Sequence, residues 1–314
     1  MRLPGIFACR CVAGAEMAIP FIREFEAPYG ANVRLSPLIG RVLANNPGPF
    51  TFKGTGVYIV GHRKVAVIDP GPLIDEHVES LKRALDGKSV SHIFVTHTHS
   101  DHSPAAKPLK EWCGATTFAF GPHGSGHPDD GPRVEEGGDR DFVPDVRLKD
   151  GDVVVGSGWT MDAVHTPGHT SNHLCFGLRE ESALFTGDHV MGWSTTVVTP
   201  PDGNMREYMA SLRKLQARDD KILYPTHGAP VLDPGPFLQA YLDHRLEREA
   251  QILACLGADI PLIPDIVERL YVNVDRRLFP AAARSVLAHL IQLSEDGRVI
   301  ADPAITPSAR FRLA

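Results

Sequence analysis

The sequence predicts a protein of mixed α/β (α+β) class. It should contain two packed sheets with helices outside them, followed by a small C-terminal domain of helices and a hairpin. Three observations support this prediction. Strand-like and helix-like segments interleave up to about residue 235, and several strands follow one another directly. Such an order favours two sheets packed face to face over one parallel sheet. Clusters of His and Asp follow several strand ends, and beyond Pro234 the pattern changes to amphipathic helices.

Length and composition set the broad class. The 314 residues are enough for one large domain or two, and 43% hydrophobic with 22% charged residues is typical of a globular protein. A net charge of −6 provides no general footprint for nucleic acid. No apolar run reaches the roughly 18 residues of a membrane span, so no membrane association is expected. Five scattered cysteines without a C-x-x-C motif indicate reduced thiols and a cytoplasmic protein.

The first residues differ from the rest of the chain. Residues 1–16 contain a weak apolar stretch that Arg10 interrupts, which leaves it too short for a signal peptide. Met17 is as good a start as Met1. We therefore expect a disordered extension over 1–16, a main domain over 17–235 and a C-terminal domain over 236–314.

Elements of the first half follow from hydrophobic periodicity. Residues 21–52 suggest irregular strands and loops, because Pro and Gly recur there. Gly121 to Gly138 is rich in Gly, Pro and acids and predicts a surface loop. We therefore do not expect its His123 and His127 to be ligands. The other expected elements are strands at 57–60, 65–69, 93–95 and 116–120 and helices at 74–85 and 104–112.

Elements of the second half divide into two parts. The first part contains strands at 152–155, 159–164, 173–178, 183–185 and 221–224, with a helix at 206–215. The second part contains helices at 236–256, 263–271 and 279–293 and short strands at 298–301 and 310–313. The first of these helices is expected to bury Leu238, Tyr241, Leu242, Leu246 and Ile252 on one side. Three helices followed by a hairpin is the order of a winged-helix domain.

A cluster of metal-ligand residues follows the third expected strand. The sequence Thr96-His97-Thr98-His99-Ser100-Asp101-His102 places four candidate ligands within six residues. Imidazole and carboxylate groups bind zinc and the neighbouring divalent ions. A polar loop that is His-rich by chance is the structural alternative, and the segment lies where a buried strand gives way to a loop. The cluster therefore predicts a metal site.

Three later motifs supply partners for this cluster. His165-Thr166-Pro167-Gly168-His169-Thr170, Thr186-Gly187-Asp188 and Pro225-Thr226-His227-Gly228 each follow an expected strand. A turn residue at each point allows a sharp change of direction. Several strand ends that meet at one edge of a sandwich would bring these side chains together.

These four motifs resemble those of the metallo-β-lactamase fold hydrolases over roughly residues 20–235. The resemblance implies an αββα sandwich and a two-metal site along one edge, with a hydroxide bridging the metals. Three ligands would hold the first metal, namely His97, His99 and His169. The second would be held by Asp101, His102 and His227, and Asp188 would bridge the two.

Two longer stretches resemble one branch of this superfamily. These are residues 185–215 and the segment Tyr241-Leu242-Asp243-His244-Arg245 with the residues that follow it. They are similar to the β-lactamase-like protein two branch, which has an added C-terminal winged-helix-like domain and endoribonuclease activity on single-stranded RNA. The expected C-terminal domain contains about as many acids as arginines and no Lys. Packing or homodimer formation is therefore as reasonable a role for it as contact with nucleic acid.

Other side chains could support the ligands. A carboxylate can orient a water and accept its proton, so Asp101 is the candidate catalytic residue. His165 and His173 flank His169 and either could hydrogen-bond a ligand, although purely structural contacts are equally compatible. Asp69 follows a strand and precedes Pro70-Gly71, where the resemblance places a residue that positions the metal-binding loop. A His/Asp ligand set suits zinc and also tolerates manganese or iron.

The leading functional hypothesis is a dinuclear metal-dependent phosphodiesterase that cleaves single-stranded RNA. A thioester hydrolase of the glyoxalase II type is the nearest enzymatic alternative, since the resemblance gives it the same seven ligands; a small ester or thioester would then be the substrate. A third hypothesis, from another class, is a nucleic-acid-binding protein with a vestigial metal site. A β-lactamase, a persulfide dioxygenase and a β-CASP nuclease fit the motif set less well. The 39 residues from Asp188 to His227 are too few to contain the insert of a β-CASP nuclease.

Overall fold

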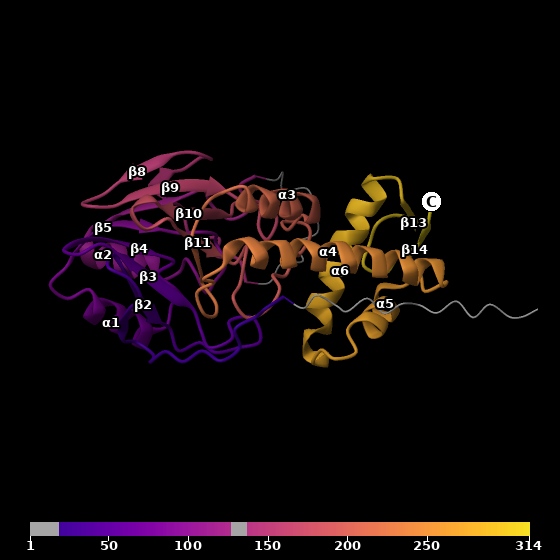
Figure 1. Cartoon of the computed structure of the whole chain (residues 1–314), viewed down its shortest axis with the longest axis horizontal. Coiled ribbons are helices and arrows are strands. Elements are labelled where there is room, and N and C mark those ends of the chain that lie inside the picture. The colour runs from indigo at the N-terminus through magenta and orange to yellow at the C-terminus, as the bar shows by residue number, and fades with distance from the viewer. Residues whose placement is uncertain (1–18, 127–136) are drawn as a thin grey trace, which may run out of the picture.

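Two β-sheets form one lobe of the molecule, and the C-terminal helices extend from it (Figure 1). The computed structural model describes residues 19–126 and 137–314. The expected extension over 1–16 lies outside these residues, as do Cys9, Cys11 and His127. Three described cysteines, Cys113, Cys175 and Cys255, have free thiols.

The first sheet contains seven strands in sequence order. Its first four strands pair antiparallel, and the pairs from the fourth to the seventh are parallel. Helices α1 (Asp75–Ala84) and α2 (Ala106–Cys113) pack on it through Leu81 and Leu109. The strands are β1 (Asn32–Arg34), β2 (Ile39–Leu43), β3 (Gly56–Val60), β4 (Lys64–Ile68), β5 (Ser89–Phe94), β6 (Thr116–Ala119) and β7 (Val146–Arg147).

The second sheet contains five strands in the order β12-β11-β10-β9-β8. Helix α3 (Met205–Gln216) packs on it through apolar side chains such as Tyr208 and Leu212. A 3-10 turn, η1 (Arg179–Glu181), joins its two central hairpin strands. The strands are β8 (Val153–Val155), β9 (Thr160–His165), β10 (Leu174–Leu178), β11 (Ala183–Gly187) and β12 (Ile222–Pro225).

An aromatic core lies between the two sheets. Tyr58 and Phe94 from the first sheet contact Phe176 and Phe185 from the second, and Trp159 packs beside them. These side chains are almost fully buried, and burial of a large aromatic side chain stabilises a fold by roughly 1.5–3 kcal/mol. The layers are thus helix, sheet, sheet, helix, which confirms the predicted sandwich.

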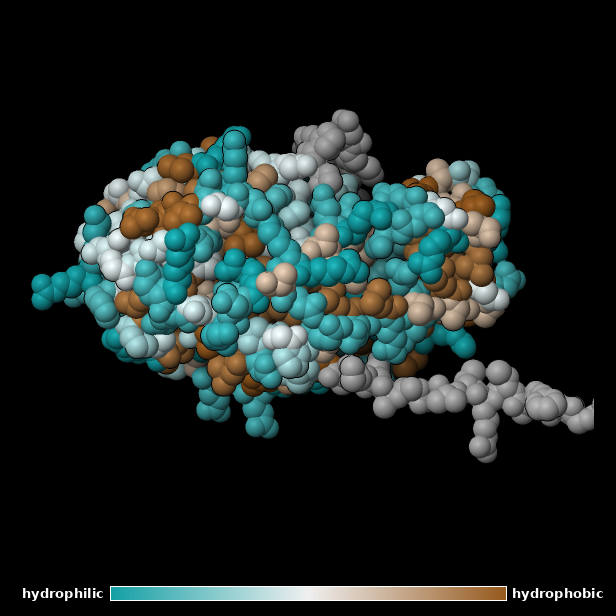
Figure 2. Space-filling view, turned by 45° about the horizontal axis from the view of Figure 1, so that its top comes forward, coloured by the Kyte–Doolittle hydropathy of each residue, from teal (hydrophilic) through white to brown (hydrophobic). Residues whose placement is uncertain are grey.

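The C-terminal part consists of three helices and a two-stranded hairpin, as the sequence predicted. They are α4 (Pro234–Gly257), α5 (Ile263–Leu270), α6 (Phe279–Glu295), β13 (Val299–Asp302) and β14 (Arg310–Leu313), with a 3-10 turn, η2 (Arg276–Leu278), before α6. No described helix is long and apolar enough to cross a bilayer. On the face seen in Figure 2, hydrophobic residues occur in separate patches among hydrophilic ones.

Helix α4 packs on both lobes. Phe237 and Tyr241 near its start belong to the core beneath α3, and Ile252 and Leu256 near its end belong to the core of the C-terminal part. The expected domain boundary between residues 235 and 236 lies in the first turn of α4, and the residues just after it still pack in the hydrolase core. The prediction that Leu246 is buried with this helix's apolar side was wrong, since 48% of its surface is exposed.

The loop after β6 holds a histidine in place. His123 was expected to lie in a surface loop without a fixed partner, but its Nδ1 lies 3.0 Å from the Thr98 hydroxyl. Thr98 also accepts a hydrogen bond from the Asn172 amide at 3.0 Å. This part of the loop therefore packs directly behind the His-rich segment.

Candidate metal centre

Four strand ends converge at one edge of the sandwich and bring the predicted ligands together. β5 leads to His97, His99, Asp101 and His102; β9, β11 and β12 lead to His169, Asp188 and His227. Three overlapping groups of these residues have ligand atoms within 4.8 Å of one another. The convergence is the result of parallel pairing of β11 with β12 and of the close packing of the two sheets.

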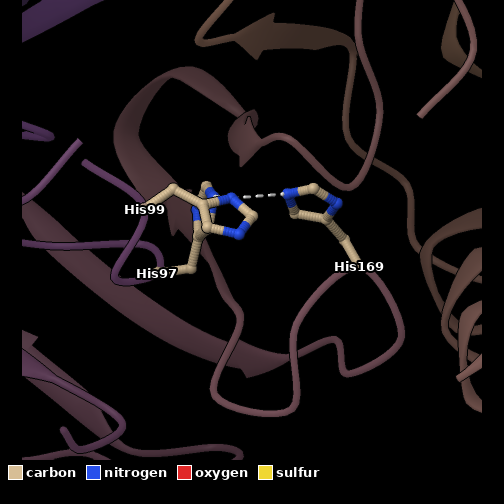
Figure 3. Close-up of side chains that lie close together, drawn as sticks. All are labelled: His97, His99 and His169. Carbon is tan, nitrogen blue, oxygen red and sulfur yellow. Dashed lines mark hydrogen bonds between the residues drawn. The ribbon is translucent and has the colours of Figure 1, made fainter. Parts of the chain in front are cut away.

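The first group is made of three imidazoles that point toward one another (Figure 3). The Nδ1 atom of His99 lies 2.9 Å from His97 Nε2 and 3.1 Å from His169 Nε2. A tetrahedral zinc ion with Zn–N bonds of about 2.0–2.1 Å would hold its nitrogens about 3.3 Å apart. Both distances from His99 Nδ1 are thus close to the spacing that such an ion needs.

The second group combines a carboxylate with two buried imidazoles. His227 Nε2 lies 3.1 Å from Asp101 Oδ2, and His102 Nε2 lies 3.6 Å from the same oxygen. Asp188 separates this group from the first. Its Oδ1 lies 3.4 Å from His227 Nε2 and 3.6 Å from His102 Nε2, whereas its Oδ2 lies 3.9 Å from His169 Nε2. The two oxygens of Asp188 therefore face different groups.

Several ligand atoms are buried without a hydrogen bond in the described part of the chain. They are His102 Nε2, His227 Nε2 and Asp188 Oδ1. A buried polar atom without a partner is costly, so a cluster of three implies a missing binding partner. A divalent cation fits this donor set, because imidazole nitrogens and carboxylate oxygens are all electron-pair donors.

The opposite ring nitrogens hold the imidazoles in place. His97 Nδ1 lies 3.0 Å from the Thr96 hydroxyl, and His102 Nδ1 lies 2.9 Å from Asp69. The other two rings contact backbone carbonyl oxygens. His169 Nδ1 lies 2.7 Å from the Val197 oxygen, and His227 Nδ1 lies 3.2 Å from the Gly54 oxygen. Such contacts fix the tautomer and leave the Nε2 lone pair free for a metal.

Asp69 connects the ligand loops. It has a positive φ of 49° and is fully buried, and it accepts hydrogen bonds from the Thr96 N–H at 2.7 Å and the Thr96 hydroxyl at 2.8 Å. It also accepts one from Thr226 at 3.0 Å and lies 2.9 Å from His102 Nδ1. One carboxylate thus joins the turn after β4 to the loops after β5 and β12.

A glycine allows the His169 loop to pack closely on α3. Gly168 has a φ of +134°, and a Cβ at this position would lie 2.3 Å from the Tyr208 Cα. No side chain can occupy that space without moving the backbone of α3. Asn204, the N-cap of α3, donates its backbone N–H to the Gly168 carbonyl at 2.9 Å. The His169 loop is therefore fixed to the start of α3.

The two flanking histidines have different surroundings. His173 is fully buried, its Nδ1 lies 2.9 Å from Thr166, and its Nε2 accepts a hydrogen bond from the Asp188 N–H at 3.3 Å. The Nε2 of His165 instead lies 3.1 Å from the Ser171 carbonyl oxygen, and its ring stacks on Phe120. The structure therefore brings His173 to a candidate ligand, whereas it places His165 against groups that hold the loop in shape.

The charges of the centre oppose one another. Burial lowers the pKa of His227, but Asp188 and Asp101 outweigh it and raise this pKa to about 10. Burial also lowers the pKa of His102, which the carboxylates of Asp101 and Asp188 raise well above its ordinary value. His97 differs, since burial and the neighbouring imidazoles hold its pKa well below the ordinary value. Without metal, His102 and His227 are therefore protonated at neutral pH.

Metal loading is expected to release about two protons at pH 7. His227 holds its proton up to about pH 10, and the pKa of His102 is also well above neutral, so both rings must lose a proton when Nε2 binds a metal. Metal affinity should therefore rise with pH from neutral toward about 10. Calorimetry in buffers of different ionisation enthalpy measures this release, and loading without proton release would contradict the assignment of these rings.

Two family descriptions match the chain. The Metallo-beta-lactamase superfamily matches residues 51–227, which contain all seven candidate ligands, and the Beta-lactamase associated winged helix domain matches residues 263–305. The chain belongs to the metallo-β-lactamase superfamily. It is a metal-dependent hydrolase with a C-terminal winged-helix domain, as the sequence motifs predicted.

Curated relatives of this hydrolase include thioesterases and a beta-lactamase-like protein. The atrochrysone carboxyl ACP thioesterase AacuM of Aspergillus aculeatus is 36% identical over 287 residues, which cover 85% of this chain and 84% of that protein. The similar thioesterase nsrC of Aspergillus novofumigatus is 35% identical over 71% of this chain, but the match spans only 64% of its own length. The beta-lactamase-like protein 2 homolog of Caenorhabditis elegans is 32% identical over 286 residues, which cover 85% of this chain and 87% of that protein.

Solved structures share the fold of this hydrolase. A beta-lactamase domain protein from Burkholderia ambifaria superposes with a TM-score of 0.75 at 20% identity and covers 93% of this chain and 96% of that one. A metallo-beta-lactamase family protein from Thermus thermophilus gives a TM-score of 0.72 at 23% identity, and the match covers 90% of this chain and 100% of that one. Both likenesses include the C-terminal region and show the common architecture.

Proposed function

We propose that the chain hydrolyses an acyl thioester at a two-metal centre. The observation that carries this proposal is the arrangement of seven ligand side chains in two groups with Asp188 between them. The first metal would be held by His97, His99 and His169; the second by Asp101, His102 and His227; and Asp188 would bridge both. Zinc is the proposed metal, and manganese or iron also suits the donors.

The chemistry divides between the metals and the chain. Two divalent ions held by these side chains would supply a Lewis acid for the carbonyl oxygen and would lower the pKa of a water. Asp101 is the more open of the two carboxylates, with 24% of its side chain exposed against 12% for Asp188. In the metal-free protein, the charges of His102 and His227 outweigh burial and lower the pKa of Asp101. Bound cations would likewise keep this carboxylate ionised. We assign Asp101 the catalytic role of orienting the water and accepting its proton.

Two observations support a thioester with an apolar acyl group. Relatives such as AacuM are named as acyl carrier protein thioesterases. An apolar cavity of about 230 Å³ lies between Gly203 and Asn204 at the start of α3 and Leu287 and Ile291 on α6. Asn204 is bonded to Gly168, next to the ligand His169. Asn204 thus connects the cavity wall to the loop that carries His169, and the apolar lining is suited to an apolar group.

Phosphodiester cleavage in single-stranded RNA is the second candidate. The similarity to the beta-lactamase-like protein 2 homolog over most of both chains favours it. We rank it below the thioester because the cavity between Asn204 and Leu287 is mainly apolar and suits an acyl group. The third hypothesis, a binding protein with a vestigial metal site, conflicts with a complete ligand set. A homodimer and a cytoplasmic location stay predictions.

A panel of substrates separates these candidates. The metal-loaded protein is expected to hydrolyse an aromatic or medium-chain acyl thioester of pantetheine at least about tenfold faster than lactoylglutathione, because the apolar cavity favours the larger acyl group by roughly 1–3 kcal/mol. A single-stranded RNA and a generic phosphodiester complete the panel. Thiol release and RNA cleavage are measured with and without chelator. Cleavage of RNA alone would overturn the thioesterase proposal and retain the two-metal centre.

Leu287→Arg places a charge in the apolar cavity, and Leu232→Arg, at an exposed position outside it, is the matched control. We expect Leu287→Arg to raise KM for the acyl thioester while metal content is unchanged, and Leu232→Arg to leave both unchanged. Equal KM values for the two variants would show that the cavity does not bind the acyl group.

A further inference from the structure

A second cavity lies among α3, α4 and α6, and it is basic. It has a volume of about 130 Å³ and is lined by Arg206 and Arg213 from α3, Arg245 and Glu249 from α4, and His289 from α6. We call it the basic cavity. None of these residues belongs to the metal centre. Helices from the hydrolase domain and the C-terminal part therefore meet around a group of cationic side chains.

Arg245 is buried in this cavity without a counter-charge. Only 3% of its surface is exposed, and it makes no ion pair with any described carboxylate. One of its terminal nitrogens donates to the Thr196 carbonyl, its guanidinium lies 5.1 Å from the centre of the Tyr208 ring, and its Nε has no hydrogen bond. A buried unpaired charge is strongly unfavourable. An anion in the cavity would neutralise it.

His289 on α6 adds a buried side chain, without a hydrogen-bond partner among the described residues, to the lining of this cavity. It is 2% exposed, and neither ring nitrogen has a hydrogen-bond partner in the described part of the chain. Burial and the nearby Arg245 and Arg248 lower its pKa to about 3, so the ring is neutral and holds one N–H donor. Water can accept that hydrogen bond but cannot compensate the charge of Arg245.

The other charged groups around the cavity are unevenly paired. Arg206 is held by Glu295 at 3.1 Å and Asp296 at 2.8 Å, and Glu249 is held by Arg298 at 2.5 Å. Arg213 is exposed at the mouth and pairs with no described acid. Two unpaired arginines thus face the cavity, while its one acid is already neutralised. The balance of charge favours an anionic ligand.

We infer that the basic cavity binds a phosphate-class oxyanion between Arg213, Arg245 and His289. The volume is enough for one tetrahedral anion and a few waters, given that a water takes about 30 Å³ of liquid. Guanidinium groups bind phosphate oxygens through charge-assisted hydrogen bonds. The inference does not depend on the proposed thioesterase function, because no residue of the cavity is a candidate metal ligand.

The basic cavity is connected to the metal centre through one threonine. Arg245 donates to the Thr196 carbonyl, and the Thr196 hydroxyl donates to the Asp188 carbonyl at 2.7 Å. Two residues, Arg245 and Thr196, would therefore connect the anion to Asp188, on the side of α3 and α4. Two sources of the anion are compatible with this place, free phosphate and the phosphate of a carrier's 4′-phosphopantetheine.

Calorimetry and thermal unfolding of the full-length, metal-loaded protein test the inference. Inorganic phosphate is expected to bind at one site and, at about ten times Kd, to raise Tm by about 3 °C over chloride of equal ionic strength. Arg213→Gln should weaken binding by about tenfold. Arg276→Gln, at an exposed arginine outside the cavity, should bind phosphate like the wild type.

His289→Leu provides the sharper variant, because it removes the buried donor without creating a charge. It should raise Tm in chloride and remove the additional rise in phosphate. Equal phosphate and chloride curves for the wild type would overturn the inference, as would an undiminished phosphate effect in both Arg213→Gln and His289→Leu. Tighter binding of 4′-phosphopantetheine than of phosphate, with pantetheine inactive, assigns the site to the carrier; equal binding assigns it to free phosphate.

Discussion

Asp188→Asn is expected to lower hydrolysis by about 10³-fold and to reduce bound metal from about two ions per chain to about one. The two carboxylate oxygens of Asp188 face different groups of imidazoles, with 3.4 Å to His227 and 3.9 Å to His169. An amide keeps the shape of the side chain but loses its charge and one acceptor, so it cannot offset the charge of two cations. Metal analysis and steady-state rates on the best substrate of the panel measure both effects.

Asp219→Asn is the matched control, because Asp219 is exposed and lies outside the centre. It should keep the metal content and rate of the wild type. His97→Ala should lose the metal of the first group, since His97 supplies one of its three ring nitrogens. If Asp188→Asn retained both ions and full activity, the bridging role of this residue would be wrong.

Asp69→Ala is expected to lower the free energy of unfolding by roughly 3–5 kcal/mol and to prevent normal metal loading. The variant leaves four polar groups around a buried site without their acceptor: the Thr96 N–H, the Thr96 and Thr226 hydroxyls, and His102 Nδ1. Ala also fits poorly at the positive φ of this position. Urea unfolding of the metal-free protein gives the stability, and metal titration gives the affinity.

Asp69→Asn distinguishes positioning from folding. Asn tolerates a positive φ and keeps one acceptor oxygen for Thr96, so most of the stability should be retained. Its amide NH₂ cannot accept from His102 Nδ1, and we therefore expect affinity in the second metal group to fall by about 10–100-fold. A variant that loses stability and affinity in the same proportion as Asp69→Ala would show that Asp69 acts on folding alone.

Hydrophobic periodicity was enough to predict most elements, because they obey local rules. The strands flanking the turn at 61–64, the helix beginning near Asp75 and the helices of the C-terminal part all appear within a few residues of their predicted bounds. The placement of Leu246 failed because α4 changes its packing partner from the hydrolase core to the C-terminal core along its length. A single hydrophobic face cannot describe a helix that bridges two cores.

The residues that hold the metal ligands in position could be predicted only in part. Asp69 was suggested by its place before Pro70-Gly71, but its hydrogen bonds to Thr96 and Thr226 depend on strands far apart in the chain. His165 and His173 have equal standing in the sequence, and only the structure shows that His173 is fully buried and accepts a hydrogen bond from the Asp188 N–H. Thr196 and Arg245 lie in the two longer stretches that resemble one branch of the superfamily, but their contacts could not be predicted, because these depend on how α4 packs against the loop after Asp188.

The class of chemistry, metal-dependent hydrolysis, and its candidate ligands could be predicted from sequence motifs alone. His and Asp side chains are suitable metal ligands, and in this chain they follow directly after strands, so four short motifs were sufficient to identify the candidates. The three-dimensional packing was needed to show which ligand atoms face one another, how the two oxygens of Asp188 are oriented, and where unpaired charge is buried away from the metal centre. These depend on distances between segments as far apart as Asp69 and Thr226, and such distances are set by the packing of two sheets and not by local sequence.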